Sequence, residues 1–487
     1  MIHQQTFKNS VLKSVLRTLI TAAPYQRCRA SALAPYAAMQ TRTLPVDASK
    51  VGQVSTLAKP DDILDELNIQ LDLSSPDARH LKDAAEKLKT SSVPVAFPTE
   101  TVYGLGADAT RSEAVKGIYK AKQRPADNPL IVHFASLKQL RSLYTSQSPA
   151  QNGAHTNGKA DDPIPAIYSP LISRFWPGPL TIIMPTPHDS PLAPEVTAGL
   201  STFGARMPRH VLALALIDTA GVPVAAPSAN ASTKPSPTAA EHVAYDLDGR
   251  IETILDGGPC DVGVESTVVD GLSSPPAILR PGGISLEQIR ACPGWEDIQI
   301  GYKNLAESGS QPRAPGMKYR HYSPKATVIL FESNKAAPST QEVRELVGPN
   351  ARLGMIRSKC WNLDVDSSER LVTQAQKQDP AVNAVSSTVD EVRGFAGMLR
   401  SLQATAKAKS PLTRHKVQLE GAQIELLDID LGPTTNNIAR GIFSALRDLD
   451  REDVDTILVE GIDDEEGDTA AAIMNRLRKA AEVRLEG

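Results

Sequence analysis

The sequence has few cysteines, little net charge and no long apolar run. Its four cysteines form no C-x-x-C pair, so neither a disulfide framework nor a zinc site is expected, and a reducing compartment suits the chain. Because the net charge is -4, a polyanion would have to bind at a local cluster of cations, not along a broad basic face. No apolar run approaches the roughly 20 residues of a membrane-spanning helix.

The common nucleotide-binding and hydrolase motifs are also absent. The sequence has no G-x-x-x-x-G-K-[ST], which excludes a P-loop NTPase, and no G-x-S-x-G or H-E-x-x-H. Residues 104–109 (GLGADA) match the dinucleotide fingerprint, and Asp127 follows about 20 residues later. However, the predicted helix begins only near Ser112, and the next strand ends in His133 and Phe134, not in an acid. A dinucleotide fold is therefore not expected.

The chain is long enough for two or three domains with real cores. It has 487 residues, of which 41% are hydrophobic and 22% charged. Composition divides it into a basic leader (1–46), a linker with approach helices (47–79), a first domain (80–300), a second linker (301–324) and a second domain (325–487). In the second domain, strands that alternate with helices predict a small parallel α/β sheet.

The leader is basic and contains no acid before Asp47. Its apolar residues recur every four positions, with cations between them, at Phe7, Val11, Val15 and Leu19. A basic, acid-free amphipathic helix is typical of a mitochondrial transit peptide, although a disordered leader without a targeting role is the alternative. Met39 could start a shorter product that stays in the cytosol, so a cytoplasmic and a mitochondrial form are both expected.

The most informative stretch runs from residue 93 to 134. It opens with VPVAF, a run of strand length and composition, and continues into a polar loop where Gly104 and Gly106 are expected to let the backbone turn. A helix capped by Ser112 follows and stops at Pro125, and LIVHF reads as a second buried strand. This βαβ pattern predicts an α/β fold with hydroxyls and cations at one rim of the sheet, where we expect the active site.

The same kind of loop, small hydroxyl residues and cations after a short apolar strand, recurs four more times. These loops contain Thr202 and Arg206, then Ser228 and Ser236, then Ser266 and Thr267, and finally Arg280. Hydroxyls, amides and guanidinium groups suit a triphosphate and a zwitterionic amino acid. Each residue also has a plainer interpretation, because isolated arginines are usually solvated, Ser and Thr often form turns, and His133 could be a core histidine. The residues alone predict an α/β enzyme that binds a small anionic ligand.

Several motifs together resemble one family. At PTETVYGLG, the K-x-R of residues 122–124, DNPLIVH, PSAN, ESTVVD and APGMKYRHYSP, the chain resembles the long, two-domain form of the YrdC-like threonylcarbamoyl-AMP synthases, over about residues 80–487. The resemblance implies a twisted mixed sheet with a concave pocket, followed by a smaller Rossmann-like parallel α/β domain. It also implies condensation of L-threonine, bicarbonate or CO2, and ATP with Mg2+ into threonylcarbamoyl-AMP and pyrophosphate.

The resemblance further implies a role for individual residues. Lys122 and Arg124 would be catalytic. L-Threonine would be held by Thr101, His133, Arg206 and Ser266. ATP would contact Arg124, Asn128, Thr202, Ala226, Ser228, Ser236, Arg280 and Tyr322, with Tyr319 as a less favoured choice for the last. The linker at 301–324 would close over the nucleotide, and the product would pass to a tRNA threonylcarbamoyl transferase complex that modifies tRNAs reading codons that begin with A.

Other functions remain open at this point. One is a double-stranded RNA-binding module, although the acidic balance allows only a weak RNA contact. Another is a regulatory protein without catalysis. A third is a carbamoyl transferase of the hydrogenase-maturation kind, but that function would want zinc-finger cysteines and an acylphosphatase-like segment, and neither is present.

Overall fold

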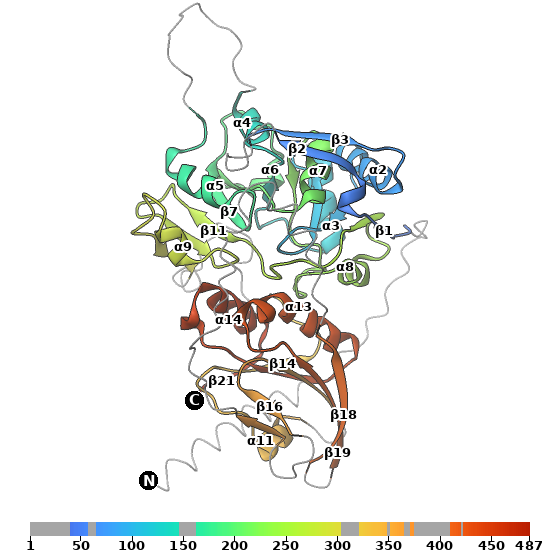
Figure 1. Ribbon diagram of the computed structural model, residues 1–487, viewed down its shortest axis with the longest axis vertical. Helices are drawn as coiled ribbons and strands as arrows, with labels where there is room; N and C mark the ends of the chain where they lie inside the picture. The colour runs from blue at the N-terminus through green and yellow to red at the C-terminus, as the bar shows by residue number, and fades with distance from the viewer. Residues whose placement is uncertain are drawn as a thin grey trace, which may run out of the picture. The chain divides into compact units, whose positions relative to one another are not determined.

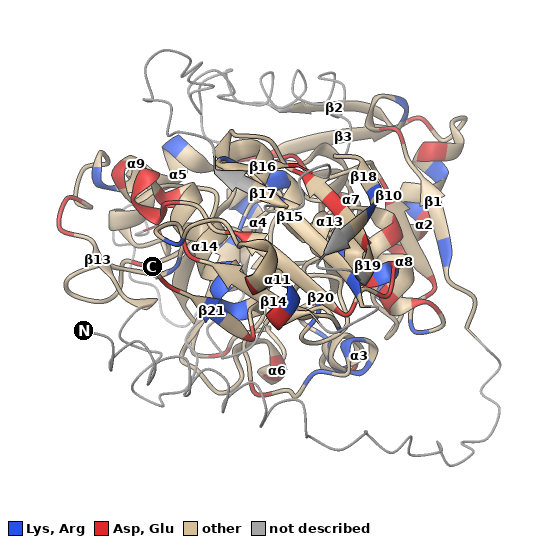
Figure 2. Cartoon of the chain, turned by 90° about the horizontal axis from the view of Figure 1, so that it is seen from below, with Lys and Arg blue, Asp and Glu red and all other residues tan. Residues whose placement is uncertain are grey.

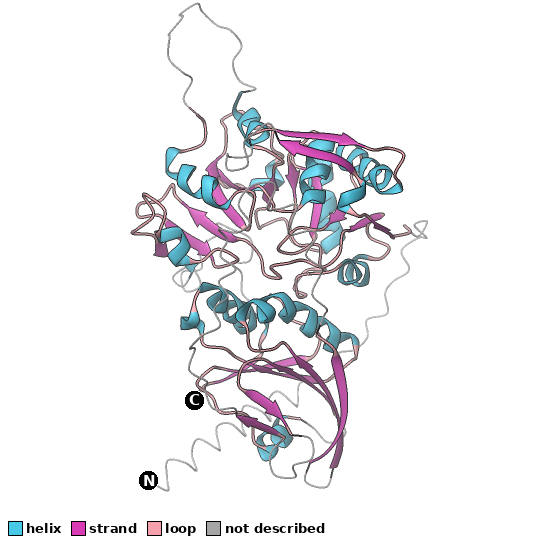
Figure 3. Cartoon of the chain, in the orientation of Figure 1, coloured by secondary structure: helices cyan, strands magenta, loops and turns pink. Residues whose placement is uncertain are grey.

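The computed structural model describes residues 39–56, 65–145, 162–302, 321–347, 351–364, 371–374, 410–419 and 422–487. The leader up to residue 38, most of the second linker and Tyr319 lie outside these ranges. Within them the chain forms two large sheets, each covered by helices, and two small two-stranded sheets (Figures 1 and 3). The predicted α/β class, with a mixed sheet followed by a smaller parallel one, is confirmed.

The first sheet has eleven strands and mixes parallel with antiparallel pairs. Its spatial order is β1 (Arg42–Pro45), β10 (Thr253–Asp256), β4 (Val95–Phe97), β5 (Gly104–Asp108), β9 (Val224–Ala225), β6 (Ile131–His133), β8 (Thr202–Arg206), β7 (Leu180–Pro185), β11 (Thr267–Asp270), β12 (Ala277–Arg280) and β13 (Gln299–Ile300). The predicted strands at 93–97 and 130–134 are β4 and β6. They are not neighbours, because β5 and β9 lie between them.

Helices pack against this sheet through two buried apolar clusters. The helices are α2 (Pro76–Thr90), α3 (Ser112–Lys122), α4 (Leu137–Thr145), α5 (Ser169–Phe175), α6 (Pro194–Thr197), α7 (Val211–Ala220), α8 (Ala240–Leu247) and α9 (Leu286–Arg290). α2 and α7 share one cluster, whereas α3, α4 and α5 share the other. α2 begins at Pro76 and is capped by Ser75, whose side chain accepts a hydrogen bond from the Asp77 amide.

The glycines of the first motif have a different role from the one predicted. Gly104 and Gly106 lie in the buried strand β5, not in a turn. A Cβ on Gly106 would come within 2.7 Å of the Phe97 ring and 2.9 Å of Val224, so this strand needs glycine for close packing. The turn that the sequence predicted there lies earlier, at residues 98–103, between β4 and β5.

The region before α2 also differs from its prediction. Among the described residues of 47–75, the only helical element is the short 3-10 turn Ala48–Lys50. The same stretch forms the antiparallel pair of strands β2 (Gly52–Thr56) and β3 (Leu67–Leu71). Residues 42–45, assigned to the leader, form β1 and pair in parallel with β10 at the edge of the large sheet. Alternating apolar and polar residues in GQVST and LNIQL fit strands better than helices.

The second sheet has six strands. In spatial order they are β18 (Leu412–Leu419), β19 (Ala422–Asp430), β15 (Arg352–Arg357), β20 (Thr456–Glu460), β14 (Thr327–Phe331) and β21 (Val483–Leu485). Every neighbouring pair is parallel except β18 with β19. The long helices α13 (Thr435–Arg451) and α14 (Asp468–Ala480) pack on one face, and α11 (Thr340–Leu346) packs on the other beside the hairpin of β16 (Trp361–Leu363) and β17 (Val372–Gln374).

Charges are mixed over the described elements. Figure 2 shows Lys and Arg interspersed with Asp and Glu along the helices and strands, in keeping with the small net charge of -4. No helix among the described residues combines the length and the apolar character that crossing a membrane requires.

Candidate active site

A cavity opens where several strands of the large sheet end. Predicted and unpredicted residues line it together: Thr99, Val102, Gly104, Arg124, Ile131, His133, Arg206, Ala226, Pro227, Ser228, Glu265, Ser266, Arg280, His321 and Tyr322. Segments separated by more than 200 residues in the sequence, from Thr99 to Tyr322, therefore meet in one place.

Strand register explains why three of these side chains converge. His133 at the end of β6 pairs with Arg206 at the end of β8, and Arg206 pairs across to Thr181 of β7. Thr181 and Arg280 both pair with Val268 of β11, from its two sides. Residues in register across a sheet share a face, so His133, Arg206 and Arg280 form one row across five neighbouring strands.

Arg206 has a buried counter-charge. Its guanidinium lies 2.8 Å from the Glu100 carboxylate, and the two side chains are 5% and 0% exposed. Burial alone would raise the pKa of Glu100, but Arg206 and Arg209 together hold it below its usual value, so the carboxylate stays ionised. Burial and the nearby Arg206 lower the pKa of His133 to about 3, which keeps this imidazole neutral.

Ser266 and Arg280 both line the cavity and are hydrogen-bonded to each other. Arg280 donates to the Ser266 carbonyl at 2.9 Å and to its hydroxyl at 3.0 Å, while the Ser266 and Thr181 hydroxyls lie 2.8 Å apart. Burial lowers the pKa of Arg280 to about 10, and the guanidinium remains charged at neutral pH. The arrangement fixes one hydroxyl and one cation side by side.

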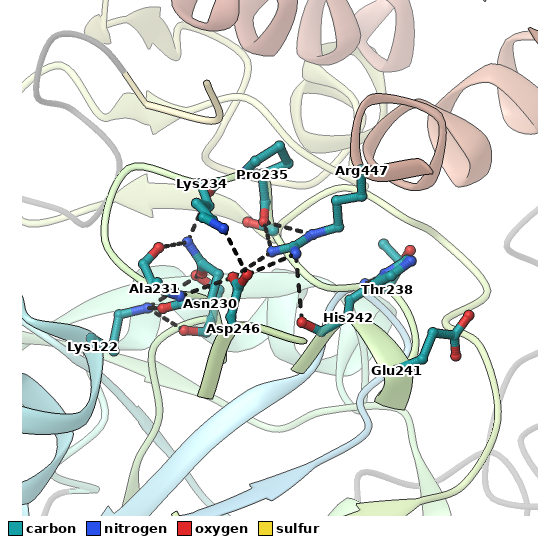
Figure 4. A network of polar contacts seen from close by, with 12 residues as sticks. Lys122, Asn230, Ala231, Lys234, Pro235, Thr238, Glu241, His242, Asp246 and Arg447 are labelled. Carbon is teal, nitrogen blue, oxygen red and sulfur yellow. Dashed lines mark hydrogen bonds and ion pairs between the residues drawn. The ribbon is translucent and has the colours of Figure 1, made fainter. Parts of the chain in front are cut away.

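Lys122 differs from its predicted place, because it does not line the cavity. Its ammonium nitrogen donates to the Ser228 carbonyl at 2.5 Å, to the Asn230 carbonyl at 2.7 Å and to the Asn230 side chain at 3.3 Å (Figure 4). These contacts use all three of its donors. Burial and the nearby Arg124 lower its pKa well below the usual value. In this geometry Lys122 holds the loop that brings Ser228 to the cavity.

The other predicted residues divide into two groups. Arg124, Ala226, Ser228 and Tyr322 line the cavity together with the row described above. Thr101, Asn128, Thr202 and Ser236 do not. Thr101 lies behind Thr99, with the two hydroxyls 3.0 Å apart, and Ser236 donates to Glu265 at 2.6 Å. Thr202 begins β8, about 13 Å of strand away from Arg206 at its other end.

Sequence reasoning assigned no role to Glu265. Its carboxylate lines the cavity and accepts from Ser236 on one oxygen and from Arg476 of α14, at 3.0 Å, on the other. Burial would raise its pKa, but Arg476 and Arg280 lower it to about 2. The only signal in the sequence was the acid that stands beside Ser266 in ESTVVD. Its partner Arg476 is 211 residues away and could not be found from local pattern.

The cavity is suited to binding anions without covalent catalysis. Three guanidinium groups, Arg124, Arg206 and Arg280, reach it together with the hydroxyls of Ser228 and Ser266. The histidine beside them is neutral, and its Nδ1 has no hydrogen-bond partner among the described residues, so no serine or cysteine is paired with that nitrogen. Such a site can orient charged reactants and neutralise charge that develops between them.

Two family models together cover most of the chain. The Sua5/YciO/YrdC model, described as "Telomere recombination", matches residues 90–282, and the model "Threonylcarbamoyl-AMP synthase, C-terminal domain" matches residues 284–482. A threonylcarbamoyl-AMP synthase of Schizosaccharomyces pombe is 44% identical over 84% of this chain and 89% of its own length. One of Bacillus subtilis is 40% identical over 86% of this chain and 96% of its own length.

A solved structure agrees with these matches. The crystal structure of Pyrococcus abyssi Sua5 complexed with L-threonine is similar to this chain with a TM-score of 0.58 and 36% identity, over 83% of this chain and 96% of that one. Matches of this extent include both domains and the segment between them. The chain therefore belongs to the threonylcarbamoyl-AMP synthase family, in its long two-domain form.

Proposed function

We propose that this protein condenses L-threonine, bicarbonate or CO2, and ATP into threonylcarbamoyl-AMP and pyrophosphate. The observation that carries the proposal is the row of His133, Arg206 and Arg280 across neighbouring strands, completed by Arg124 and Ser228, in a chain that belongs to this family. A neutral imidazole and fixed guanidinium groups in one cavity can hold an amino acid and a nucleotide at the same time.

We assign the threonine end of the cavity to Arg206, His133 and Ser266. A guanidinium suits the carboxylate of the amino acid, and hydroxyl groups suit its polar side chain. Glu100 keeps Arg206 in place before substrate enters, since the pair is buried at 2.8 Å. Thr101 would act indirectly, because its hydroxyl contacts the Thr99 hydroxyl and not the cavity. The Thr99 hydroxyl in turn donates to the Val102 carbonyl at 2.7 Å.

The nucleotide end is assigned to Arg124, Arg280, Ser228, Ala226 and Tyr322. We propose that ATP enters as its Mg2+ complex, in which the metal would help to neutralise the phosphate charge. Lys122 and Asn128 support this end, because Lys122 binds the Ser228 carbonyl and the Asn128 carbonyl accepts from Tyr119 at 3.1 Å.

The chemistry needs no nucleophile from the protein. The threonine amine attacks CO2 and loses a proton, which gives a carbamate. A carbamate oxygen then attacks the α-phosphorus of ATP, the bond to the bridging oxygen breaks, and pyrophosphate leaves with its electron pair. Arg124 and Arg280 offset the charge that accumulates on the phosphates, and the cavity holds both reactants in contact.

We also propose that the linker closes over the cavity and protects the labile adenylate from water. His321 and Tyr322, the described end of the linker's aromatic motif, line the cavity. Tyr322 is 3% exposed, and its ring centre lies 5.1 Å from that of Phe443 in α13. Deletion of residues 314–324 should shorten the lifetime of the adenylate, and an unchanged lifetime would contradict this role.

The cellular setting is a further proposal. The product would pass to a tRNA threonylcarbamoyl transferase complex, and the basic leader would direct one form of the protein to mitochondria. A product that starts at Met39 would keep β1, which begins at Arg42, so both forms would retain the complete sheet. Fractionation of cells that express the two forms with a C-terminal tag should place only the longer one in mitochondria.

The reaction itself is tested by mass spectrometry of the products from L-threonine, bicarbonate and Mg-ATP. We expect threonylcarbamoyl-AMP and pyrophosphate in equal amounts, and neither when threonine is omitted. ATP–pyrophosphate exchange that depends on threonine would separate a catalyst from a regulatory relative. Formation of ADP and phosphate, or turnover without threonine, would contradict the proposed function.

A further inference from the structure

We propose that Arg447 and Arg476, from the two long helices of the C-terminal domain, are positioning residues for the active site. Each guanidinium is buried and binds loops of the catalytic domain that carry residues of the cavity. The C-terminal domain would thus complete the catalytic site, not merely accompany it. This inference rests on the proposed function, since its first readout is the Michaelis constant for ATP.

Arg476 joins the two segments that bring Ser266 and Arg280 to the cavity. It is 1% exposed, donates to the Glu265 carboxylate at 3.0 Å and donates to the Pro281 carbonyl at 2.6 Å. Glu265 directly precedes Ser266, and Pro281 directly follows Arg280. One guanidinium from α14 therefore fixes the backbone on both sides of the Ser266–Arg280 pair.

Arg476 also keeps the Glu265 carboxylate away from Arg280. Arg280 is near enough to Glu265 to help lower the pKa of that carboxyl. If Arg476 were absent, Arg280 would be the main remaining positive charge that acts on the buried carboxylate, and the two would pair. The nucleotide would then lose the cation that Arg280 supplies, even though no residue that touches the nucleotide had been changed.

Arg447 plays the equivalent part at the loop of residues 228–236. Its guanidinium, 3% exposed, lies 2.8 Å from the Asp246 carboxylate and also donates to the Pro235 carbonyl (Figure 4). The same Asp246 oxygen accepts from the Ala231 amide at 3.0 Å. The loop is thus held from one side by Arg447 and from the other by Lys122, which binds its carbonyls at 228 and 230.

Apolar packing brings the two arginines to these loops. Val102 and Val264 of the catalytic domain belong to the same buried cluster as Phe443 and Ile473 of the C-terminal helices. The backbone at Gly263 approaches α13 so closely that an added Cβ would lie 2.4 Å from the Arg440 Cα. Because both guanidinium groups are buried, their ion pairs are formed in an environment of low local dielectric.

The α14 helix offers a matched control for the experiment. Arg478 lies two residues after Arg476 and pairs with Glu332 and Asp464, both of the C-terminal domain, at 2.8 and 2.6 Å. On α13, the exposed Arg451 donates to the Glu241 carbonyl, and its guanidinium lies 5.1 Å from the centre of the Tyr245 ring, both in α8. Arg478→Gln and Arg451→Gln remove the same charge from the same helices without touching the loops of the cavity.

The test compares these variants in steady-state kinetics and in titration calorimetry with ATP as the probe. We expect Arg476→Gln to raise the KM for ATP at least tenfold and to weaken ATP binding in parallel, whereas Arg478→Gln leaves both within twofold. Arg447→Gln should also lower kcat/KM at least tenfold, and Arg451→Gln should not. The double variant Arg476→Gln/Glu265→Gln should bind ATP more tightly than Arg476→Gln alone. That recovery would identify the unpaired Glu265 carboxylate as the cause of the weaker binding.

Further outcomes keep the two proposals separate. If the parent protein makes threonylcarbamoyl-AMP and folded Arg476→Gln keeps its ATP affinity, the positioning role is wrong and the proposed function stands. If the parent makes no product, the proposed function is wrong, and calorimetry still decides whether Arg476 controls the nucleotide site. If Arg476→Gln fails to fold, Arg476→Lys replaces it in the experiment, because lysine keeps the positive charge but cannot reach both Glu265 and Pro281. Kinetics of Arg476→Lys equal to those of the parent would show that a guanidinium is not required at this position.

Discussion

The carboxylate of Glu100 lies 2.8 Å from the guanidinium of Arg206, and both side chains are buried beside the cavity. Because Glu100 remains ionised there, the cation that we assign to the threonine carboxylate is already paired before substrate arrives. A substrate carboxylate must therefore share Arg206 with Glu100. We expect it to bind the guanidinium N–H groups that Glu100 does not occupy.

Glu100→Gln should destabilise the free protein strongly. The change leaves a buried guanidinium without a counter-charge, which costs about 3–5 kcal/mol in comparable pairs. We expect the free energy of unfolding, measured with urea, to fall by about 3 kcal/mol, and added L-threonine to recover part of it. Glu66→Gln, which removes an exposed partner of Lys138, is the control and should have far less effect. Equal effects of the two changes would contradict the buried pair.

Arg124→Ala should abolish most activity and leave the fold intact. Arg124 lines the cavity in the segment after α3, where its charge is assigned to the phosphates. Loss of one such contact is expected to lower kcat/KM about 100-fold, or about 2.7 kcal/mol. The rate of threonine-dependent ATP consumption measures the effect. Arg111→Ala, at the other end of α3, removes donors to the Lys89 and Ser91 carbonyls and should keep the parental rate.

Ser266→Ala should mainly raise the threonine concentration that the enzyme needs. The hydroxyl accepts from Arg280 and lies 2.8 Å from the Thr181 hydroxyl, so its removal leaves both groups without this partner. A loss of about 1–2 kcal/mol corresponds to a rise in the KM for threonine of roughly tenfold, with a smaller change in kcat. If instead only the KM for ATP changed, Ser266 would belong to the nucleotide end of the cavity and our assignment to the threonine end would be wrong.

Stability should decrease in mild acid. Burial lowers the pKa of His133 and His321 to about 3 and that of His210 to about 4, whereas the pKa of histidine in an unfolded chain is about 6.5. Between these values the unfolded state binds protons that the folded state does not, so the free energy of unfolding rises with pH and levels off above about 6.5. Each histidine contributes up to about 1.4 kcal/mol per pH unit.

The slope can be assigned to one residue by substitution. His133→Gln should reduce the slope of the unfolding free energy between about pH 5 and 6 by close to one proton, or about 1.4 kcal/mol per unit. His188→Gln, at an imidazole that is 94% exposed, is the control for replacing a histidine outside the core. If His133→Gln kept the parental slope, the histidine would not be buried and neutral in the native protein.

Gly263→Ala should separate the catalytic loop from α13. The glycine has a φ of +79°, and an added Cβ would lie 2.4 Å from the Arg440 Cα and 2.5 Å from the Ala439 carbonyl. Gly258→Ala meets the same backbone strain at a φ of +88° but has no atom within 4 Å of the added Cβ. We expect Gly263→Ala to lower both Tm and kcat/KM more than Gly258→Ala. Equal losses would show that this contact contributes nothing beyond local strain.

Local pattern was sufficient to predict much of this fold. The strand in the apolar run at 93–97 and the strand around His133 are confirmed, because their signals lie within one element. The strand of Gly104 and Gly106 was missed. Its glycines resemble a turn in sequence, yet they are required by the Phe97 ring and Val224, which only the folded sheet brings near.

The sequence predicted residues that line the cavity directly better than residues that hold the loops of the cavity in place. Arg124, Arg206 and Arg280 converge as expected, because two of them end strands of the large sheet and Arg124 follows α3. Lys122 was expected among them, but its ammonium group is occupied by carbonyls more than 100 residues away. Arg476 was not predicted at all, since nothing in α14 indicates that one of its arginines faces another domain.

The most direct test of the account is a crystal structure of this protein with threonylcarbamoyl-AMP bound. We predict that the threonyl carboxylate contacts Arg206, that the α-phosphate lies beside Arg124 or Arg280, and that Tyr322 covers the nucleotide. Density for the adenylate at a different place, with these arginines contacting no part of it, would contradict the claim that one cavity holds both substrates.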